Sequence, residues 1–131
     1  MSRHNRPCIH KEPHSAAVHR CCQARNRALV DCKNLQLTAY NSAELGAEAY
    51  LANLPDLNSI SEIKDYAACI NHAIAISVVE PYEGNAMLGT ARLVLDSIRT
   101  EMKAHESVIR TGIARDRFDR SYPKKEPKSA A

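Results

Sequence analysis

The chain has 131 residues, of which 44% are hydrophobic, so its length and composition fit one domain with a modest core. It contains five Tyr, one Phe and no Trp, and the core is therefore predicted to be aliphatic and rich in alanine. No apolar run approaches the roughly 18 residues that a membrane span requires, and the first residues lack the apolar stretch of a signal peptide. These features argue against a membrane protein and predict a cytoplasmic location, where thiols stay reduced.

Charge is distributed unevenly along the chain. Residues 1–33 carry a net charge of +5, residues 34–111 carry −5 and residues 112–131 carry +3, which together give the overall +3. We expect residues 1–13 to form a flexible basic arm and residues 112–131 to form a disordered basic tail. The tail either contacts nucleic acid phosphates or is a solvated terminus that aids solubility. The candidate contacts are Arg115, Arg117, Arg120, Lys124 and Lys125.

The N-terminal third holds eight of the eleven Cys and His residues of the chain. Zinc prefers four sulfur or nitrogen ligands in a tetrahedron, usually supplied by closely spaced pairs. This density predicts possible ligands for zinc, although no C-x2-C pair is present. The candidate ligands are Cys8, His10, His14, Cys21 and Cys32.

Residues 14–40 also have the pattern of one helix, which competes with the zinc interpretation. In a helix Cys21 and Cys32 would lie about 16 Å apart along the axis, too far for one zinc ion to bridge. Either the segment is helical and its cysteines are small core residues, or it folds around metal and is not one helix. Residues 20–37 contain no Gly or Pro, which favours the helix. A partial site that uses Cys8, His10 and His14 remains an alternative.

A second helix is expected over residues 42–54. Asn41 and Glu44 stand at the spacing of a helix cap, and Pro55 ends the segment because the residue before a proline disfavours helical geometry. A turn over residues 56–59 is then expected.

Two longer amphipathic segments follow, over residues 59–79 and 81–111. Ser59 and Glu62 have capping-box spacing, and Pro81 suits the first turn of a helix, where its missing N–H costs nothing. Gly84 and Gly89 weaken the start of the last helix by about 1 kcal/mol each relative to alanine; they either permit a close approach or allow fraying. The last helix has heptad spacing, which favours antiparallel packing of the two segments. Its stripe consists of Leu88, Ala91, Leu95, Ile98, Met102, His105 and Ile109.

These elements predict an all-α fold, an antiparallel bundle of three to four helices within residues 14–111. The segment 59–79 is apolar around most of its circumference. This apolar surface is wider than one neighbouring helix can cover. Self-association is therefore expected.

The order of Cys8, Cys21 and Cys32, followed by an Asp-x-Asn-Ser stretch at residues 56–59, resembles a group of small uncharacterised soil-bacterial proteins. In that group a Cys-x8–10-Cys-x10-Cys-x2-His module precedes a helix pair. Here the first gap is longer, and Leu35 stands where the group has histidine. The resemblance covers residues 8–100 loosely and implies no activity.

One motif points to catalysis. Arg99 and His105 resemble the Arg-x4–6-His signature of the all-helical HEPN ribonucleases, which implies general acid–base chemistry on RNA. Chance alone produces such short spacings in a chain with this many Arg and His residues. No Gly-rich phosphate loop is present, and we infer no small-molecule substrate.

The leading hypothesis is a non-enzymatic helical interaction module whose basic ends touch nucleic acid. The alternatives are a metal-dependent nucleic-acid-binding regulator and a HEPN-like ribonuclease.

Overall fold

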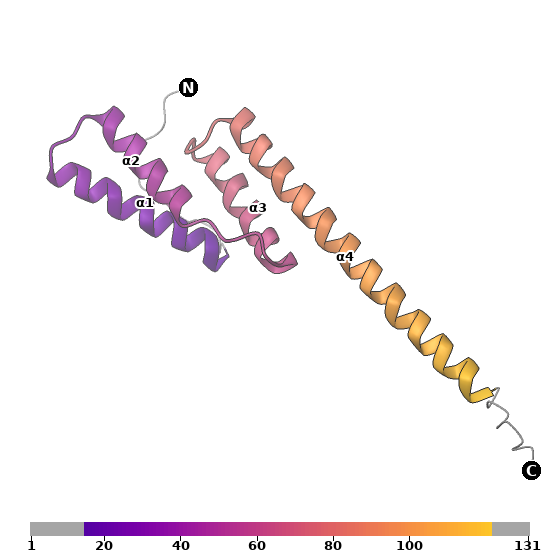
Figure 1. Cartoon of the computed structure of the whole chain (residues 1–131). Helices are drawn as coiled ribbons and strands as arrows, with labels where there is room; N and C mark the ends of the chain where they lie inside the picture. The colour runs from indigo at the N-terminus through magenta and orange to yellow at the C-terminus, as the bar shows by residue number, and fades with distance from the viewer. Residues whose placement is uncertain (1–14, 122–131) are drawn as a thin grey trace, which may run out of the picture. The chain divides into compact units, whose positions relative to one another are not determined.

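A computed structural model describes residues 15–121, with side chains through residue 117. Within that range the chain forms four α-helices and no strand, which confirms the predicted all-α bundle (Figure 1). The helices are α1 (Ala16–Asn34), α2 (Ala39–Ala52), α3 (Ile60–Ala75) and α4 (Pro81–Ser121). The flexible arm predicted for residues 1–13 lies outside the described residues. None of the helices in the described range combines the length and the apolar character that crossing a bilayer requires.

Helix α1 is shorter than the predicted 14–40. It starts where Ser15 accepts a hydrogen bond from the N–H of Val18, but it ends at Asn34. Gln36 adopts a left-handed conformation with φ of 55°. The N–H groups of Gln36 and Leu37 then bond to the carbonyls of Lys33 and Cys32, which is a Schellman motif. The prediction was wrong here because the motif normally has Gly at the left-handed position, and no Gly marks this end.

Helix α2 begins three residues before the predicted start. Thr38, rather than Asn41, caps it, and the Thr38 hydroxyl accepts a hydrogen bond from the N–H of Asn41. The helix ends at Ala52, and the amide of Asn53 bonds back to the carbonyl of Ala49. The predicted cap at Asn41 was wrong because Thr38 caps the helix one turn earlier, which places Asn41 within the first turn.

Helix α3 has the predicted capping box at its start. The Ser59 hydroxyl accepts from the N–H of Glu62, and the Glu62 carboxylate accepts from the N–H of Asn58. The helix ends at Ala75, earlier than the predicted 79, because a second Schellman motif forms around Ser77, whose φ is 59°. Residues 76–80 consequently make a loop, and their Val78 and Val79 side chains are buried in the core.

Helix α4 begins at Pro81, as predicted, but continues to Ser121 rather than ending at residue 111. Residues 112–121, predicted to belong to a disordered tail, are therefore helical. Residues 113–121 contain no Gly or Pro, and Asp116 and Arg120 have the i,i+4 spacing that supports a helix. The remaining residues of that tail, 122–131, lie outside the described part of the chain.

The chain divides into two compact units, residues 1–96 and residues 97–131. In the first unit α1 packs against both α2 and α3, and the buried residues of these helices and of the loop after α3 form the core. Tyr50 of α2 is fully buried, and its hydroxyl donates a hydrogen bond of 2.7 Å to the carbonyl of Cys69 in α3. His72 of α3 is half-buried, and its ring is stacked on Tyr50 with 6.4 Å between the ring centroids.

The close approach of α3 and the start of α4 depends on one glycine. A Cβ built on Gly84 would lie 2.5 Å from Cδ1 of Ile74, so only hydrogen fits there. Gly89 has no atom within 4 Å of the equivalent position. Of the two possibilities left by the sequence, close approach therefore applies to Gly84 and not to Gly89. Ile63 of α3 and Leu95 of α4 line a common groove further along, so the two helices run antiparallel (Figure 1).

Candidate interaction surfaces

The described cysteines lie in the core and not at the surface. Cys21, Cys22, Cys32 and Cys69 are all buried thiols. The sulfur atoms of Cys21 and Cys69 lie 3.9 Å apart, and the Cys21 thiol donates a hydrogen bond of 3.2 Å to the carbonyl of Asn53. Cys21 and Cys32 therefore lie in the core as residues of one helix, as the helical interpretation of this segment predicts.

The thiol pair is electrostatically asymmetric. The hydrogen bond with Cys69 lowers the pKa of Cys21, and the nearby Arg20 acts in the same direction against the effect of burial. The same hydrogen bond, together with burial, raises the pKa of Cys69 far above its usual range. Of the two thiols, Cys21 therefore loses its proton more readily than Cys69.

The predicted zinc ligands are not brought together in the part of the chain that the structure describes. Among those residues no group of three or more Cys, His, Asp or Glu side chains has an arrangement suited to a metal ion. The other predicted ligands, Cys8, His10 and His14, lie outside the described residues. The zinc hypothesis therefore has no support from the geometry of residues 15–121.

Arg99 and His105, the candidate catalytic pair, are both exposed on α4. They are six positions apart in the sequence, so they lie about 9 Å apart along the helix axis and about 120° apart around it. A reaction at one phosphate needs both groups within hydrogen-bonding reach of it. The two side chains project from different sides of one helix, and neither lines the hollow around Gly112 further along α4.

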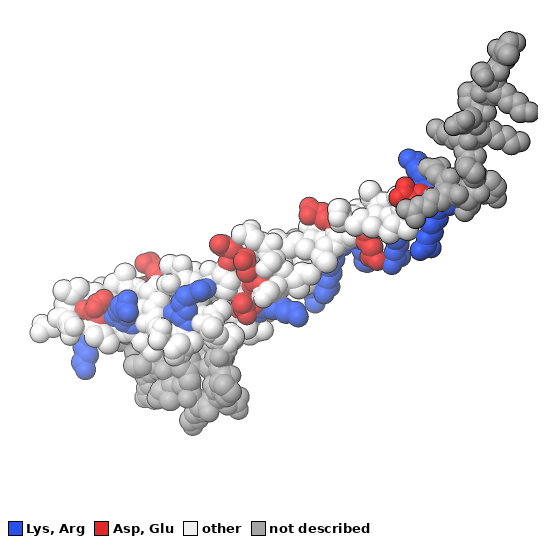
Figure 2. All heavy atoms as spheres, turned by 90° about the horizontal axis from the view of Figure 1, so that it is seen from below, with Lys and Arg blue, Asp and Glu red and all other residues white. Residues whose placement is uncertain are grey.

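Of the basic candidates for nucleic acid contact, Arg115 and Arg117 are exposed on α4. Arg120 lies in the same helix, but its side chain is not described, and Lys124 and Lys125 lie outside the described residues. On the face that Figure 2 shows, acidic and basic side chains both occur along the described surface. That face lacks the unbroken basic surface expected of a nucleic acid interface.

A groove of about 440 Å³ lies between α3 and the first part of α4. It is mainly apolar, and its floor is open where Gly89 lacks a side chain. Sequence reasoning did not find this groove, although the absence of a side chain at position 89 was a signal for it. The lining residues are Ile63, Ala67, Asn85, Leu88, Gly89, Ala91, Arg92 and Leu95.

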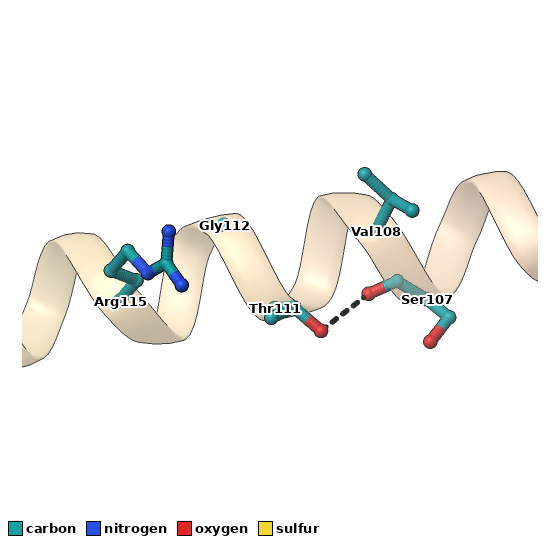
Figure 3. A pocket seen from close by; sticks show the side chains of 5 residues that line it. All are labelled: Ser107, Val108, Thr111, Gly112 and Arg115. Carbon is teal, nitrogen blue, oxygen red and sulfur yellow. Dashed lines mark hydrogen bonds between the residues drawn. The ribbon is translucent and has the colours of Figure 1, made fainter.

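A second hollow, of about 310 Å³, lies on α4 where Gly112 leaves a gap between the Val108, Thr111 and Arg115 side chains (Figure 3). Its walls come from a single helix, and the Thr111 hydroxyl is occupied by a hydrogen bond of 2.9 Å to the carbonyl of Ser107. Residues at spacings of i, i+3, i+4 and i+7, as in 108, 111, 112 and 115, form the type of hole that receives one side chain of a neighbouring helix. The hollow has the form of a helix-packing surface and not of an enclosed ligand site.

The most distinctive surface of the second unit is an apolar stripe, which consists of Ile98, Met102, Ile109 and Ile113 of α4 together with His105. Met102 is 56% exposed, Ile109 is 48% exposed and Ile113 is 49% exposed. From Ile98 to Ile109 the stripe continues the heptad spacing of the packed part of α4, and Ile113 follows one turn later on the same face. Ile98 is half-buried and all residues from Arg99 to Arg117 are exposed, so the stripe beyond Ile98 is not covered. From the sequence, Ile98, Met102, His105 and Ile109 were predicted to pack against the preceding helix, whereas Ile113 fell in the tail predicted to be disordered.

No family model, curated protein or solved structure matches this chain. Function is therefore inferred from the geometry of these surfaces.

Proposed function

We propose that this protein is a non-enzymatic helical interaction module that self-associates through the apolar stripe of α4. The observation that carries the proposal is the exposure of Met102, Ile109 and Ile113, three large apolar side chains on one face of a continuous helix. Complete burial of a fully exposed side chain of this size is worth about 1.5–3 kcal/mol, and about half of each of these side chains is exposed. A partner helix that covers the stripe therefore gains about half of this free energy for each side chain, on both chains.

The stability of the helix beyond Asp96 supports the same proposal. Most helical stability in proteins comes from packing an apolar face. Residues 97–117 have such a face, but every residue from Arg99 to Arg117 is exposed. Packing against another helix would stabilise this segment as well as bury the stripe.

The other hypotheses stay predictions. Arg115 and Arg117 are exposed on α4, so an association of the C-terminal region with nucleic acid phosphates is compatible with self-association. The cytoplasmic location and the likeness to soil-bacterial proteins likewise stay predictions from the sequence. A HEPN-like activity and a zinc-dependent regulator lack a supporting arrangement in residues 15–121.

Sedimentation velocity of the full chain across about 2–200 μM tests the proposal. We expect a concentration-dependent shift from monomer to dimer, which Ile109→Asp abolishes because the new carboxylate would be buried in the contact. Ala114→Asp is the matched control, since it places the same charge on the opposite side of the helix. A chain that stays monomeric throughout, or an Ala114→Asp variant as defective as Ile109→Asp, would contradict the proposal.

A further inference from the structure

We infer that the apolar stripe binds a second copy of the chain in the antiparallel orientation, with Arg99 of each copy opposite Glu106 of the other. This inference rests on the proposed function and goes beyond it by assigning the partner, its direction and its register. It is carried by the charged residues that border the stripe.

Two of these residues lie on one side of the stripe. If Ile98, Met102, His105 and Ile109 occupy the a and d positions of a heptad, Arg99 and Glu106 both take the e position, about 10 Å apart along the axis. Glu101 and Val108 take the g position on the other side. All four residues are exposed. The e side carries one positive and one negative charge, whereas the g side carries one negative charge and an apolar residue.

The two possible orientations differ in the charges that they bring together. In a parallel pair a g residue meets the e residue five positions later on the other chain, so Glu101 would face Glu106 twice. In an antiparallel pair e faces e and g faces g, so Arg99 faces Glu106 twice and Glu101 faces Val108. The antiparallel pair replaces two repulsive contacts with two attractive ones.

The apolar residues allow the same register. When Arg99 lies opposite Glu106, Ile98 of one copy lies near Ile109 of the other, and Met102 lies near His105. Each contact then occurs twice about a two-fold axis, as a symmetric dimer requires. One kind of layer pairs Ile98 with Ile109, and the other pairs Met102 with His105. No Asp, Glu, Lys or Arg side chain therefore lies in the centre of the contact.

Glu106 already pairs with Arg110 one turn along the same helix. The Arg110 and Glu106 side chains in this pair are 77% and 58% exposed, respectively. Exposed i,i+4 pairs contribute little, so Glu106 is able to turn toward a second copy at small cost.

Charge reversal tests the orientation through the dimer dissociation constant, measured by sedimentation. Arg99→Glu and Glu106→Arg should each weaken the dimer about tenfold, because each creates two like-charge contacts. The double variant Arg99→Glu/Glu106→Arg should return to within about twofold of the parent. Lys103→Glu, which changes an exposed charge away from the stripe, serves as the control. A stronger dimer for Glu106→Arg alone would indicate the parallel pair and overturn the inference.

A photo-crosslink measures the same geometry directly. With p-benzoylphenylalanine at position 98 and a mixture of ¹⁴N- and ¹⁵N-labelled chains, mixed-isotope crosslinked peptides report contacts between copies. We expect the crosslinks to map near Ile109 of the second copy. Crosslinks from position 98 to position 98 would overturn the antiparallel inference while leaving self-association intact, whereas a strictly monomeric chain would overturn both.

Discussion

The two units of this chain use similar side chains in opposite ways. In residues 15–96, Ile70 of α3 is fully buried and Ala91 of α4 is 2% exposed. In residues 97–117, Met102 and Ile109 continue the heptad stripe of Ala91, yet about half of each is exposed. The comparison teaches that helical periodicity identifies a face that can pack, but not whether the same chain supplies the partner.

Truncation of matched isoleucines gives the largest expected difference between the units. Ile70→Ala should lower the free energy of unfolding by about 2–5 kcal/mol, because it removes fully buried carbon atoms and leaves a cavity. Ile109→Ala should change it by less than about 0.5 kcal/mol in the monomer. Chemical denaturation at a concentration below dimer formation measures both. Equal losses would show that Ile109 is packed within its own chain.

Two glycines of α4 sharpen the comparison within the first unit. Gly84→Ala should destabilise the fold by about 1–2 kcal/mol, because the added Cβ meets Ile74 and packing strain exceeds the gain in helix propensity. Gly89→Ala, which meets no neighbouring atom, should stabilise the fold by about 0.5–1 kcal/mol. Thermal unfolding followed by circular dichroism compares the two. Stabilisation by both variants would mean that α3 and α4 are not closely packed at Gly84.

A smaller effect is expected from one hydroxyl group. Tyr50→Phe should cost about 1 kcal/mol, because it removes the buried hydrogen bond to the carbonyl of Cys69. Tyr82, which is 89% exposed, provides the matched control, and Tyr82→Phe should be neutral. The same thermal unfolding measurement applies. A neutral Tyr50→Phe would show that this hydrogen bond adds no net stability to the contact between α2 and α3.

Much of the fold could be predicted from local signals. The capping box of Ser59 and Glu62 and the first-turn position of Pro81 located two helix starts, because both signals act within one turn. The ends of α1 and α3 could not be predicted, since Gln36 and Ser77 adopt left-handed conformations that glycine usually signals. The helical end of α4 was not predicted, because its basic composition indicates disorder, although residues 113–121 contain no Gly or Pro.

By itself the sequence determined the all-α class and the amphipathic faces, because helix propensity and the 3.6-residue repeat are properties of neighbouring residues. Only the tertiary structure decided which faces are covered. It placed Cys21 beside Cys69, removed the space around Gly84, and left the stripe from Met102 to Ile113 exposed. These outcomes depend on contacts between residues that are distant in the chain, and their geometry is set by how whole helices pack.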